Sequence, residues 1–154
     1  MVTITDASRA DAEAILALQK LAYQSEAKLH DDWSLPPLTQ TLESLIEEFG
    51  GSTVLKATVE DRLIGSVRAR LSGETCLIGR LMVHPEFQRR GIGSRLLREI
   101  EIRFRDAARF ELFTGSRSEG NIRLYQRQGY AMTRTEAASP KVTLVFMEKV
   151  RFRA

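Results

Sequence analysis

The middle of the chain, residues 78–93, reads IGRLMVHPEFQRRGIG. It passes from an apolar run through a proline-containing turn into a loop with two glycines, and an amphipathic helical pattern follows. At a helix start the first backbone N–H groups have no partner within the helix, and the helix dipole makes that end positive. Gly91 and Gly93 let the backbone approach a ligand closely, while Arg89 and Arg90 add positive charge. This order of elements predicts a site for phosphate groups at the start of the helix.

Other nucleotide-binding loops fit this stretch poorly. A Walker loop needs Gly-x-x-x-x-Gly-Lys followed by Ser or Thr, and the sequence has no such string. A dinucleotide fingerprint needs Gly-x-Gly-x-x-Gly in an early parallel βαβ unit, and Gly91-Ile92-Gly93 is not followed by a third glycine at that spacing. A glycine-rich helix start that binds no ligand stays open as the remaining alternative.

On both sides of this loop, hydrophobic periodicity predicts one mixed sheet with helices packed against it. Three β-rich runs separated by short polar turns precede the loop, which indicates an antiparallel meander. The pair Pro36-Pro37 separates the two N-terminal helices. Strands are predicted at 2–5, 53–59, 63–71, 75–83, 110–114, 130–134 and 142–149, and helices at 9–22, 39–49, 92–104 and 121–128. We therefore expect an α/β (α+β) fold with a mixed, largely antiparallel central sheet flanked by helices, in one domain over residues 1–154.

The composition is that of a globular protein, since 43% of the 154 residues are hydrophobic and 28% are charged. The formal net charge is only +3, but arginines cluster between Arg89 and Arg105. Such a cluster suits a compact polyanion such as a nucleotide phosphate. Aromatic residues are not interleaved with these arginines, so nucleic acid is not the expected partner.

Cysteine and histidine are scarce. Cys76 is the only cysteine and lies in a predicted strand, so we expect a buried thiol and no intramolecular disulfide. With only two histidines in addition, a metal site is not expected. No apolar run approaches the roughly 20 residues that cross a bilayer, and the N-terminus has neither a basic leader nor an apolar signal core. We expect a cytoplasmic protein that does not bind membranes.

The loop and its context resemble the GNAT acetyltransferase superfamily. The acetyl-CoA signature of that superfamily is Gln or Arg, two residues, Gly, one residue, then Gly or Ala, and residues 88–93 fit every position. A second family motif, an Asn followed by a helix with Tyr and then by Gly and an aromatic residue, matches residues 121–130. The order of elements also agrees, so the resemblance covers nearly the whole chain. It implies a GNAT-like sheet and acetyl-CoA as co-substrate.

The resemblance also implies how the CoA molecule would be held. The strand before the loop would pair with the pantetheine arm, and the loop amides would hold the pyrophosphate. Asn121 would bond the pantetheine, and Arg127 would reach a CoA phosphate. A backbone N–H near the end of the strand would stabilise the developing oxyanion. The implied CoA-binding residues are Leu81, Met82, Val83, Gln88, Arg89, Arg90, Gly91, Ile92, Gly93, Ser94, Asn121 and Arg127.

Transfer to an amine needs an acid for the leaving thiolate and a base for the amine. In the resembled family the helix tyrosine protonates the thiolate, and Tyr125 holds that position. We select Glu26 as the base, while a packing role for Tyr125 and a structural role for Glu26 stay open, as does a chain of waters acting as the base. Further carboxylates weighed for the base are Asp31, Asp32, Glu111 and Glu119.

The sequence therefore predicts an acetyl-CoA-dependent N-acetyltransferase that attacks the thioester directly with a primary amine of unidentified class. A CoA-binding module of the same fold without turnover is the alternative. Trp33, beside two aspartates, suggests a pocket for a cationic amine, although an ordinary surface loop fits equally well. Many similar proteins are dimers, so a homodimer is compatible with the resemblance.

Overall fold

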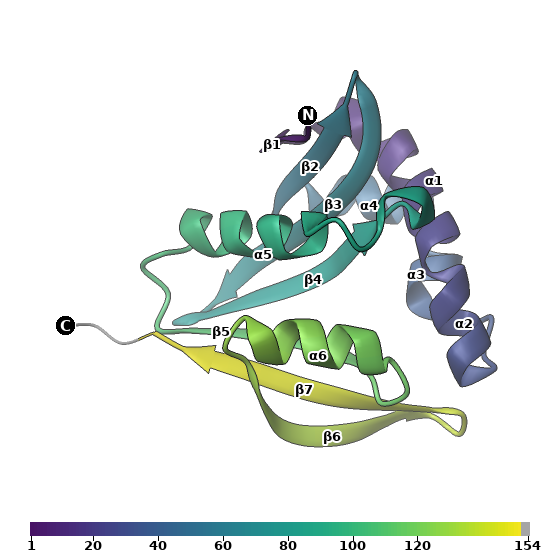
Figure 1. The fold of residues 1–154 in the computed structure, drawn as a ribbon, viewed down its shortest axis with the longest axis vertical. Helices are drawn as coiled ribbons and strands as arrows, with labels where there is room; N and C mark the ends of the chain where they lie inside the picture. The colour runs from purple at the N-terminus through teal and green to yellow at the C-terminus, as the bar shows by residue number, and fades with distance from the viewer. Residues whose placement is uncertain (152–154) are drawn as a thin grey trace.

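The computed structural model describes residues 1–151, in which helices pack against a seven-stranded sheet (Figure 1). The strands are β1 (Thr3–Asp6), β2 (Thr53–Val59), β3 (Arg62–Ser72), β4 (Thr75–Val83), β5 (Arg109–Gly115), β6 (Ala131–Ser139) and β7 (Val142–Val150). The helices are α1 (Ala12–Ala22), α2 (Gln24–His30), α3 (Pro36–Thr39), α4 (Leu42–Glu48), α5 (Ile92–Arg103) and α6 (Glu119–Arg127). Two short 3-10 turns, η1 (Arg9–Asp11) and η2 (Pro85–Phe87), complete the order.

The strands lie in the order β1-β2-β3-β4-β5-β7-β6. Every neighbouring pair is antiparallel except β4 and β5, which are parallel. The exception arises because α5 connects β4 to β5, and parallel neighbours need such a crossover. The predicted fold class is therefore confirmed.

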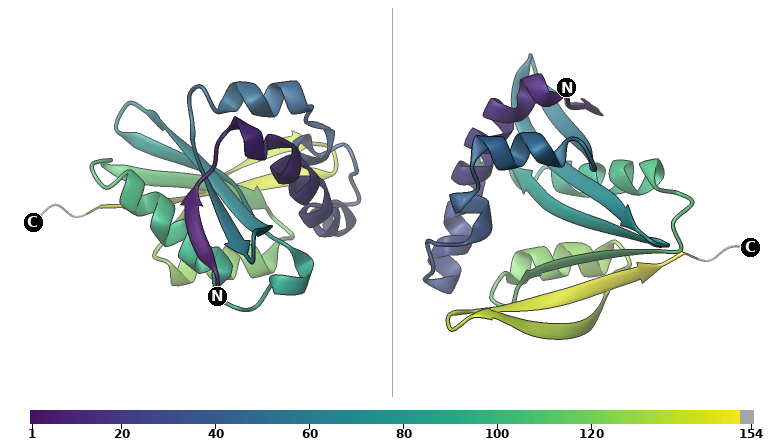
Figure 2. Two further views of the ribbon diagram at one scale, coloured as in Figure 1. Left: turned by 90° about the horizontal axis from the view of Figure 1, so that it is seen from above. Right: turned by 180° about the vertical axis from the view of Figure 1, so that it is seen from behind.

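Helices α1 and α4 cover one face of the sheet, and α5 and α6 cover the other (Figure 2). An apolar core lies on each face. Successive residues of β2 supply both, because side chains alternate along a strand: Leu55 packs in the core beneath α5, and Val54 packs with α1 and α4. The α5 stripe that faces the sheet includes Leu96 and Ile100, both fully buried. The buried thiol expected for Cys76 is confirmed in the same core.

The structure departs from the predicted elements mainly between α1 and α4 and at β6. Two short helices, α2 and α3, lie between α1 and α4, where the sequence predicted none. Pro36 does not prevent α3 because it is the first residue of that helix, where no N–H is needed. The next helix begins at Leu42 rather than at 39, since the Thr41 hydroxyl caps it by accepting from the Ser44 N–H. Strand β6 continues to Ser139 instead of ending at 134.

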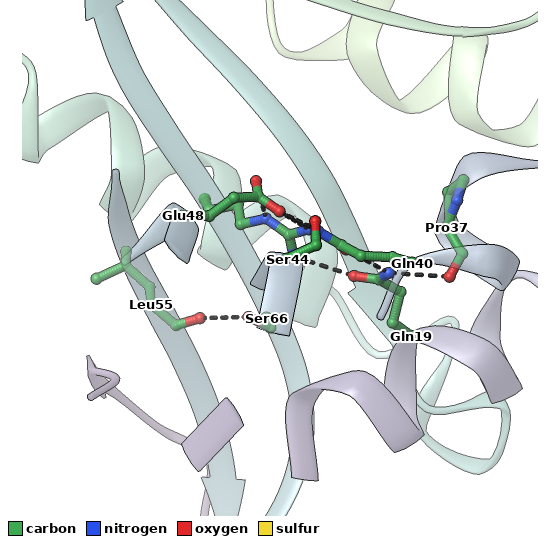
Figure 3. Close-up of polar contacts among 8 residues, drawn as sticks. Gln19, Pro37, Gln40, Ser44, Glu48, Leu55 and Ser66 are labelled. Carbon is green, nitrogen blue, oxygen red and sulfur yellow. Dashed lines mark hydrogen bonds and ion pairs between the residues drawn. The ribbon is translucent and has the colours of Figure 1, made fainter. Parts of the chain in front are cut away.

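A buried cluster of polar side chains joins β3 to the N-terminal helices (Figure 3). The Arg68 side chain is only 4% exposed, and its guanidinium binds the Glu48 carboxylate at 3.0 Å. It also donates to the side-chain oxygens of Gln19 and Gln40, each at 3.0 Å. Gln19 donates in turn to the Pro37 carbonyl at 2.9 Å. Each of these buried polar side chains has a hydrogen-bond partner, and together the contacts fix α1, α3 and α4 relative to the sheet.

Breaking this cluster should destabilise the fold measurably. We expect Glu48→Ala to lower the free energy of unfolding by roughly 2–3 kcal/mol, because a buried guanidinium loses its anion while the 36% exposure of Glu48 moderates the loss. The exposed neighbour variant Glu47→Ala is the control and should change it by less than about 0.5 kcal/mol. Urea unfolding of both variants measures the difference, and equal losses in the free energy of unfolding would contradict a stabilising role for the pair of Arg68 and Glu48.

The ion pair of Arg68 and Glu48 predicts that the stability of the fold depends on pH. Burial would raise the pKa of Glu48, but hydrogen bonds from Arg68 and Gln40 bring that pKa below its ordinary value of 4.5. A carboxylate with a lowered folded-state pKa stabilises the protein above the unfolded value and loses this contribution as the pH falls through the folded value. The gap in stability between the wild type and Glu48→Ala should therefore be constant near neutral pH and shrink below pH 4.5.

Candidate functional site

Strands β4 and β5 diverge soon after they begin. They pair only over Thr75–Leu77 and Arg109–Glu111. Beyond that point β4 runs on to Val83 and β5 to Gly115 without pairing to each other, and Figure 1 shows the two strands separating. The edge of β4 that faces β5 therefore has backbone groups available for a ligand.

A bulge bends β4 inside this diverging part. Arg80 and Leu81 together stand opposite the single residue Val67 of β3. Arg80 has a φ of 51°, in the left-handed region that non-glycine residues rarely adopt. A bulge re-aims the side chains that follow it and increases the local twist.

The glycine loop ends in an open helix start. Arg89 and Gly91 have φ values of 65° and 78°, so the loop turns sharply just before α5. The N–H of Arg95 donates to the Gly91 carbonyl at 3.1 Å, which closes the first turn of the helix. The N–H groups of Ile92, Gly93 and Ser94, which precede this first hydrogen bond, have no partner within the helix.

A cavity of about 490 Å³, the loop cavity, lies among the end of β4, the glycine loop and α6. It brings together nearly all the residues predicted to bind CoA: Leu81, Met82, Val83, Gln88, Arg89, Gly91, Ile92, Gly93, Ser94, Asn121 and Arg127. Arg90 is outside this lining, because its guanidinium lies 5.0 Å from the centre of the Phe87 ring and donates to the Glu86 carbonyl.

A second cavity of about 600 Å³, the sheet cavity, lies between the diverging strands β4 and β5. Tyr125 lines it. The two cavities share four lining residues, Tyr23, Glu26, Leu81 and Asn121. They therefore meet where the strands separate.

Glu26 is held at this meeting point by residues from the start of α6. Its carboxylate accepts hydrogen bonds from the Ser118 hydroxyl and, at 3.4 Å, from the Asn121 side-chain amide. The same amide donates to the Thr114 hydroxyl at 3.3 Å. Glu26 and Asn121, predicted from distant parts of the sequence, are thus brought into contact.

A model of the acetyltransferase (GNAT) family matches residues 13–130. The chain belongs to the GNAT acetyltransferase family. The family resemblance expected from the glycine loop is thereby confirmed, and the diverging strands and the loop cavity lie within the matched region.

Solved GNAT structures share the fold of this chain. The PaiA N-acetyltransferase of Thermoplasma acidophilum, solved in complex with coenzyme A, superposes with a TM-score of 0.79 at 18% identity, over 98% of this chain and 99% of that one. The ribosomal-protein-S18-alanine N-acetyltransferase of Escherichia coli superposes with a TM-score of 0.83 at 16% identity, over 100% and 96% of the two chains.

One curated relative is similar in sequence. It is the UPF0157 protein YqkA of Bacillus subtilis, which is 28% identical over 136 residues. That match covers 86% of this chain but only 38% of the Bacillus protein, so the GNAT chain spans well under half the length of this relative.

The environment of Tyr125 favours a protonated phenol. Its side chain is buried at 6% exposure, and burial raises its pKa well above the ordinary value of 10.0, with the nearby Tyr23 and Glu26 raising it further. Tyr125 follows Asn121 by one helical turn, so both lie on the same face of α6. The side chain also packs against Tyr130, with 6.2 Å between ring centres, so it fills space in the core as well.

Sequence reasoning missed two residues that shape this site. Tyr23 lies at the joint between α1 and α2, just beyond the predicted helix, and lines both cavities. His30 is buried, and its two ring nitrogens lie 2.9 Å from the Glu26 carbonyl and 3.3 Å from the Arg117 N–H. A Cβ on Gly115 would come within 2.2 Å of the His30 ring, so only glycine fits there. These contacts dock α2, and with it Glu26, onto the loop after β5.

The other acidic residues weighed for the base, and Trp33, have different surroundings. Glu111 lines the sheet cavity but pairs with Arg134 at 3.0 Å. Trp33 is 55% exposed and lies outside the linings of both cavities. Asp31, Asp32 and Glu119 are also outside both linings.

Two further observations concern the described residues as a whole. No helix within residues 1–151 has the length and hydropathy needed to span a bilayer. Over the same part of the chain, no group of three or more His, Cys, Asp or Glu side chains is arranged to hold a metal ion.

Proposed function

We propose that this chain transfers the acetyl group of acetyl-CoA to a primary amine. The observation that carries the proposal is the meeting of two cavities at the point where β4 and β5 separate. The loop cavity would hold CoA, and the sheet cavity would admit the amine from the other side. One acetyltransferase domain over residues 1–154, acting in the cytoplasm, completes the proposal.

The loop cavity has the groups that CoA requires. The free N–H groups at the start of α5 would bind the pyrophosphate, with the positive end of the helix dipole behind them. Arg89 and Arg127, both in the lining, would contact phosphate oxygens. The unpaired edge of β4 at Leu81 to Val83 would hydrogen-bond the pantetheine amides, and Asn121 would add a side-chain contact.

The chemistry is a direct attack, for which acetyl-CoA supplies the activated thioester. Glu26 would accept a proton from the amine as its nitrogen bonds to the thioester carbon. A backbone N–H near Met82 or Val83 would stabilise the negative charge that develops on the carbonyl oxygen. Tyr125 would donate its proton to the sulfur as the carbon–sulfur bond breaks. Holding both reactants at one point would supply much of the rate acceleration.

Two measurements test this function. Acetyl-CoA at about 100 times its Kd should raise the Tm by roughly 5–10 °C, because it binds only the folded state. Free CoA thiol should then be released on addition of an amine from a library of amino acids, polyamines and antibiotics. A thermal shift without thiol release for any amine would favour the binding-module alternative. The buried phenol of Tyr125 beside Glu26 favours the enzyme.

The proposed base has its own test. We expect Glu26→Gln to lower kcat/KM by roughly 10²-fold at neutral pH, because the amide cannot take the proton from the amine. The loss should shrink at higher pH as more of the amine becomes neutral. Glu111→Gln is the matched control, since Glu111 lines the same cavity but is already paired with Arg134. Equal effects of the two substitutions on kcat/KM would exclude Glu26 as the base.

A further inference from the structure

Arg80 has an unusual environment for a charged side chain. Within residues 1–151, its Nε is the one buried side-chain nitrogen or oxygen without a hydrogen-bond partner. Arg80 lines the sheet cavity, and its backbone has the left-handed conformation at the β4 bulge. A buried donor without a partner is destabilising, so one that a fold keeps requires an explanation, such as a role in catalysis or in binding an ion.

The other charges of the sheet cavity are largely satisfied by the protein. Arg68 is paired with Glu48, and Glu111 is paired with Arg134. Glu26 and Arg80 form no ion pair within the described part of the chain, since Glu26 is bound by neutral donors only. Arg70 also lines the cavity but is exposed to solvent. The cavity therefore presents the unpaired carboxylate of Glu26 and the unpaired guanidinium of Arg80, whose Nε is buried, to whatever enters it.

Arg80 lies close to the point where the two cavities meet. It directly precedes Leu81, which lines both cavities. Its charge also acts on Tyr23, another shared residue: burial raises the pKa of the Tyr23 phenol, and Arg80 partly offsets this. An anionic group bound to Arg80 would thus lie near the amine that Glu26 receives.

The rest of the cavity wall is mainly apolar. Leu35 and Pro36 line one side, and Val142, Leu144 and Phe146 line another. Such a wall suits an acceptor with a hydrocarbon side chain. It offers few hydrogen-bond partners to an acceptor that has a phosphate group or a polyamine chain.

Resting on the proposed acetyl transfer, we propose that the acceptor is a free amino acid with an apolar side chain, whose carboxylate binds Arg80 while its amine faces Glu26. The two unpaired charges match the two ends of a zwitterion, and the apolar wall receives the side chain. Amine acceptors without a carboxylate, such as a protein N-terminus, leave Arg80 without its partner.

The test compares each amino acid with its own amide, which keeps the amine and the side chain but has no negative charge. Valine, leucine, isoleucine, methionine and phenylalanine are assayed with acetyl-CoA by thiol release, each beside its amide. We expect the wild type to prefer at least one acid over its amide by tenfold or more in kcat/KM. In Arg80→Gln this preference should fall at least fivefold. Because the change in preference is taken within one substrate pair, the different amine pKa values of acid and amide cancel.

Two further variants separate the role of the charge from general effects. Arg80→Lys keeps a positive charge and should retain part of the preference. Arg70→Gln removes an exposed arginine from the lining of the same cavity and should leave the preference unchanged. The ligand-free Tm of Arg80→Gln should equal or exceed that of the wild type, since the substitution removes an unpaired buried donor.

The outcomes distinguish this inference from the proposed function. Turnover of amides or simple amines at the rate of the acids, or a preference kept in Arg80→Gln, would overturn the carboxylate assignment and leave acetyl transfer intact. If no amine is turned over, the same amino acids are added to the CoA-saturated protein, and a rise in Tm that is absent in Arg80→Gln would still support the inference. No such rise would overturn it. The response of the Tm to acetyl-CoA alone reports separately on the donor site.

Discussion

Replacing Tyr125 with Phe should slow acetyl transfer by roughly 10²-fold while leaving the binding of acetyl-CoA intact. The substitution removes only the hydroxyl, and the ring stays packed against Tyr130. Because burial raises its pKa, the phenol keeps its proton at neutral pH and would donate it to the sulfur only as the carbon–sulfur bond breaks. Thiol release under saturating acetyl-CoA measures the rate, and the shift in Tm on adding acetyl-CoA measures binding.

Tyr130→Phe is the matched control for this experiment. Tyr130 is also a buried tyrosine of the same core, but its hydroxyl donates to the Glu101 carboxylate at 2.8 Å. Removing that hydroxyl should lower the stability by about 1 kcal/mol and leave kcat within about twofold. If Tyr125→Phe turned over as fast as the wild type, Tyr125 would be a packing residue, and water would have to protonate the thiolate.

The parts of the site that are local in sequence could be predicted from the sequence. The strand, the turn, the glycine loop and the helix start are consecutive, and their physical roles depend on residues within the same stretch. All but one of the residues predicted for CoA therefore line the loop cavity. Arg90 is the exception. Whether its side chain enters the cavity or lies over the Phe87 ring depends on how the turn η2 folds.

Features that depend on backbone geometry or on distant contacts could not be predicted. The β4 bulge leaves the apolar pattern of the strand nearly unchanged, so the unpaired Nε of Arg80 was not foreseeable. Tyr23 acquires its position from the joint between two helices, which the helical periodicity does not report. Ser118 reaches Glu26 across 92 residues of sequence. Such contacts follow only once the sheet has brought the segments together.

The full length of strand β6 also could not be predicted from the sequence. Nearly all of its residues are exposed, so it carries no alternating apolar pattern beyond the predicted end at 134. Its continuation to Ser139 is an edge strand that pairs with β7 on one side only. Backbone hydrogen bonds, and not side-chain burial, determine its length.

The acetyl-CoA-induced rise in Tm should disappear in Gly91→Val. Gly91 has a φ of 78°, and a β-branched side chain there costs about 1–2 kcal/mol or more, so the loop would leave the left-handed conformation. The N–H groups at the start of α5 would then no longer converge on the loop cavity. A Cβ at Gly91 would meet no atom within 4 Å, so the effect comes from the backbone conformation and not from a clash.

Gly73→Val separates this loss of binding from a general loss of stability. Gly73 has a comparable φ of 61°, also has open space around its Cβ position, and lies in the turn between β3 and β4 outside both cavity linings. Both variants should lower the ligand-free Tm by about 3–8 °C, but only Gly73→Val should keep the full response to acetyl-CoA. A full response in a folded Gly91→Val would show that CoA phosphates bind elsewhere. Because the two glycines differ mainly in position, the comparison tests the loop itself.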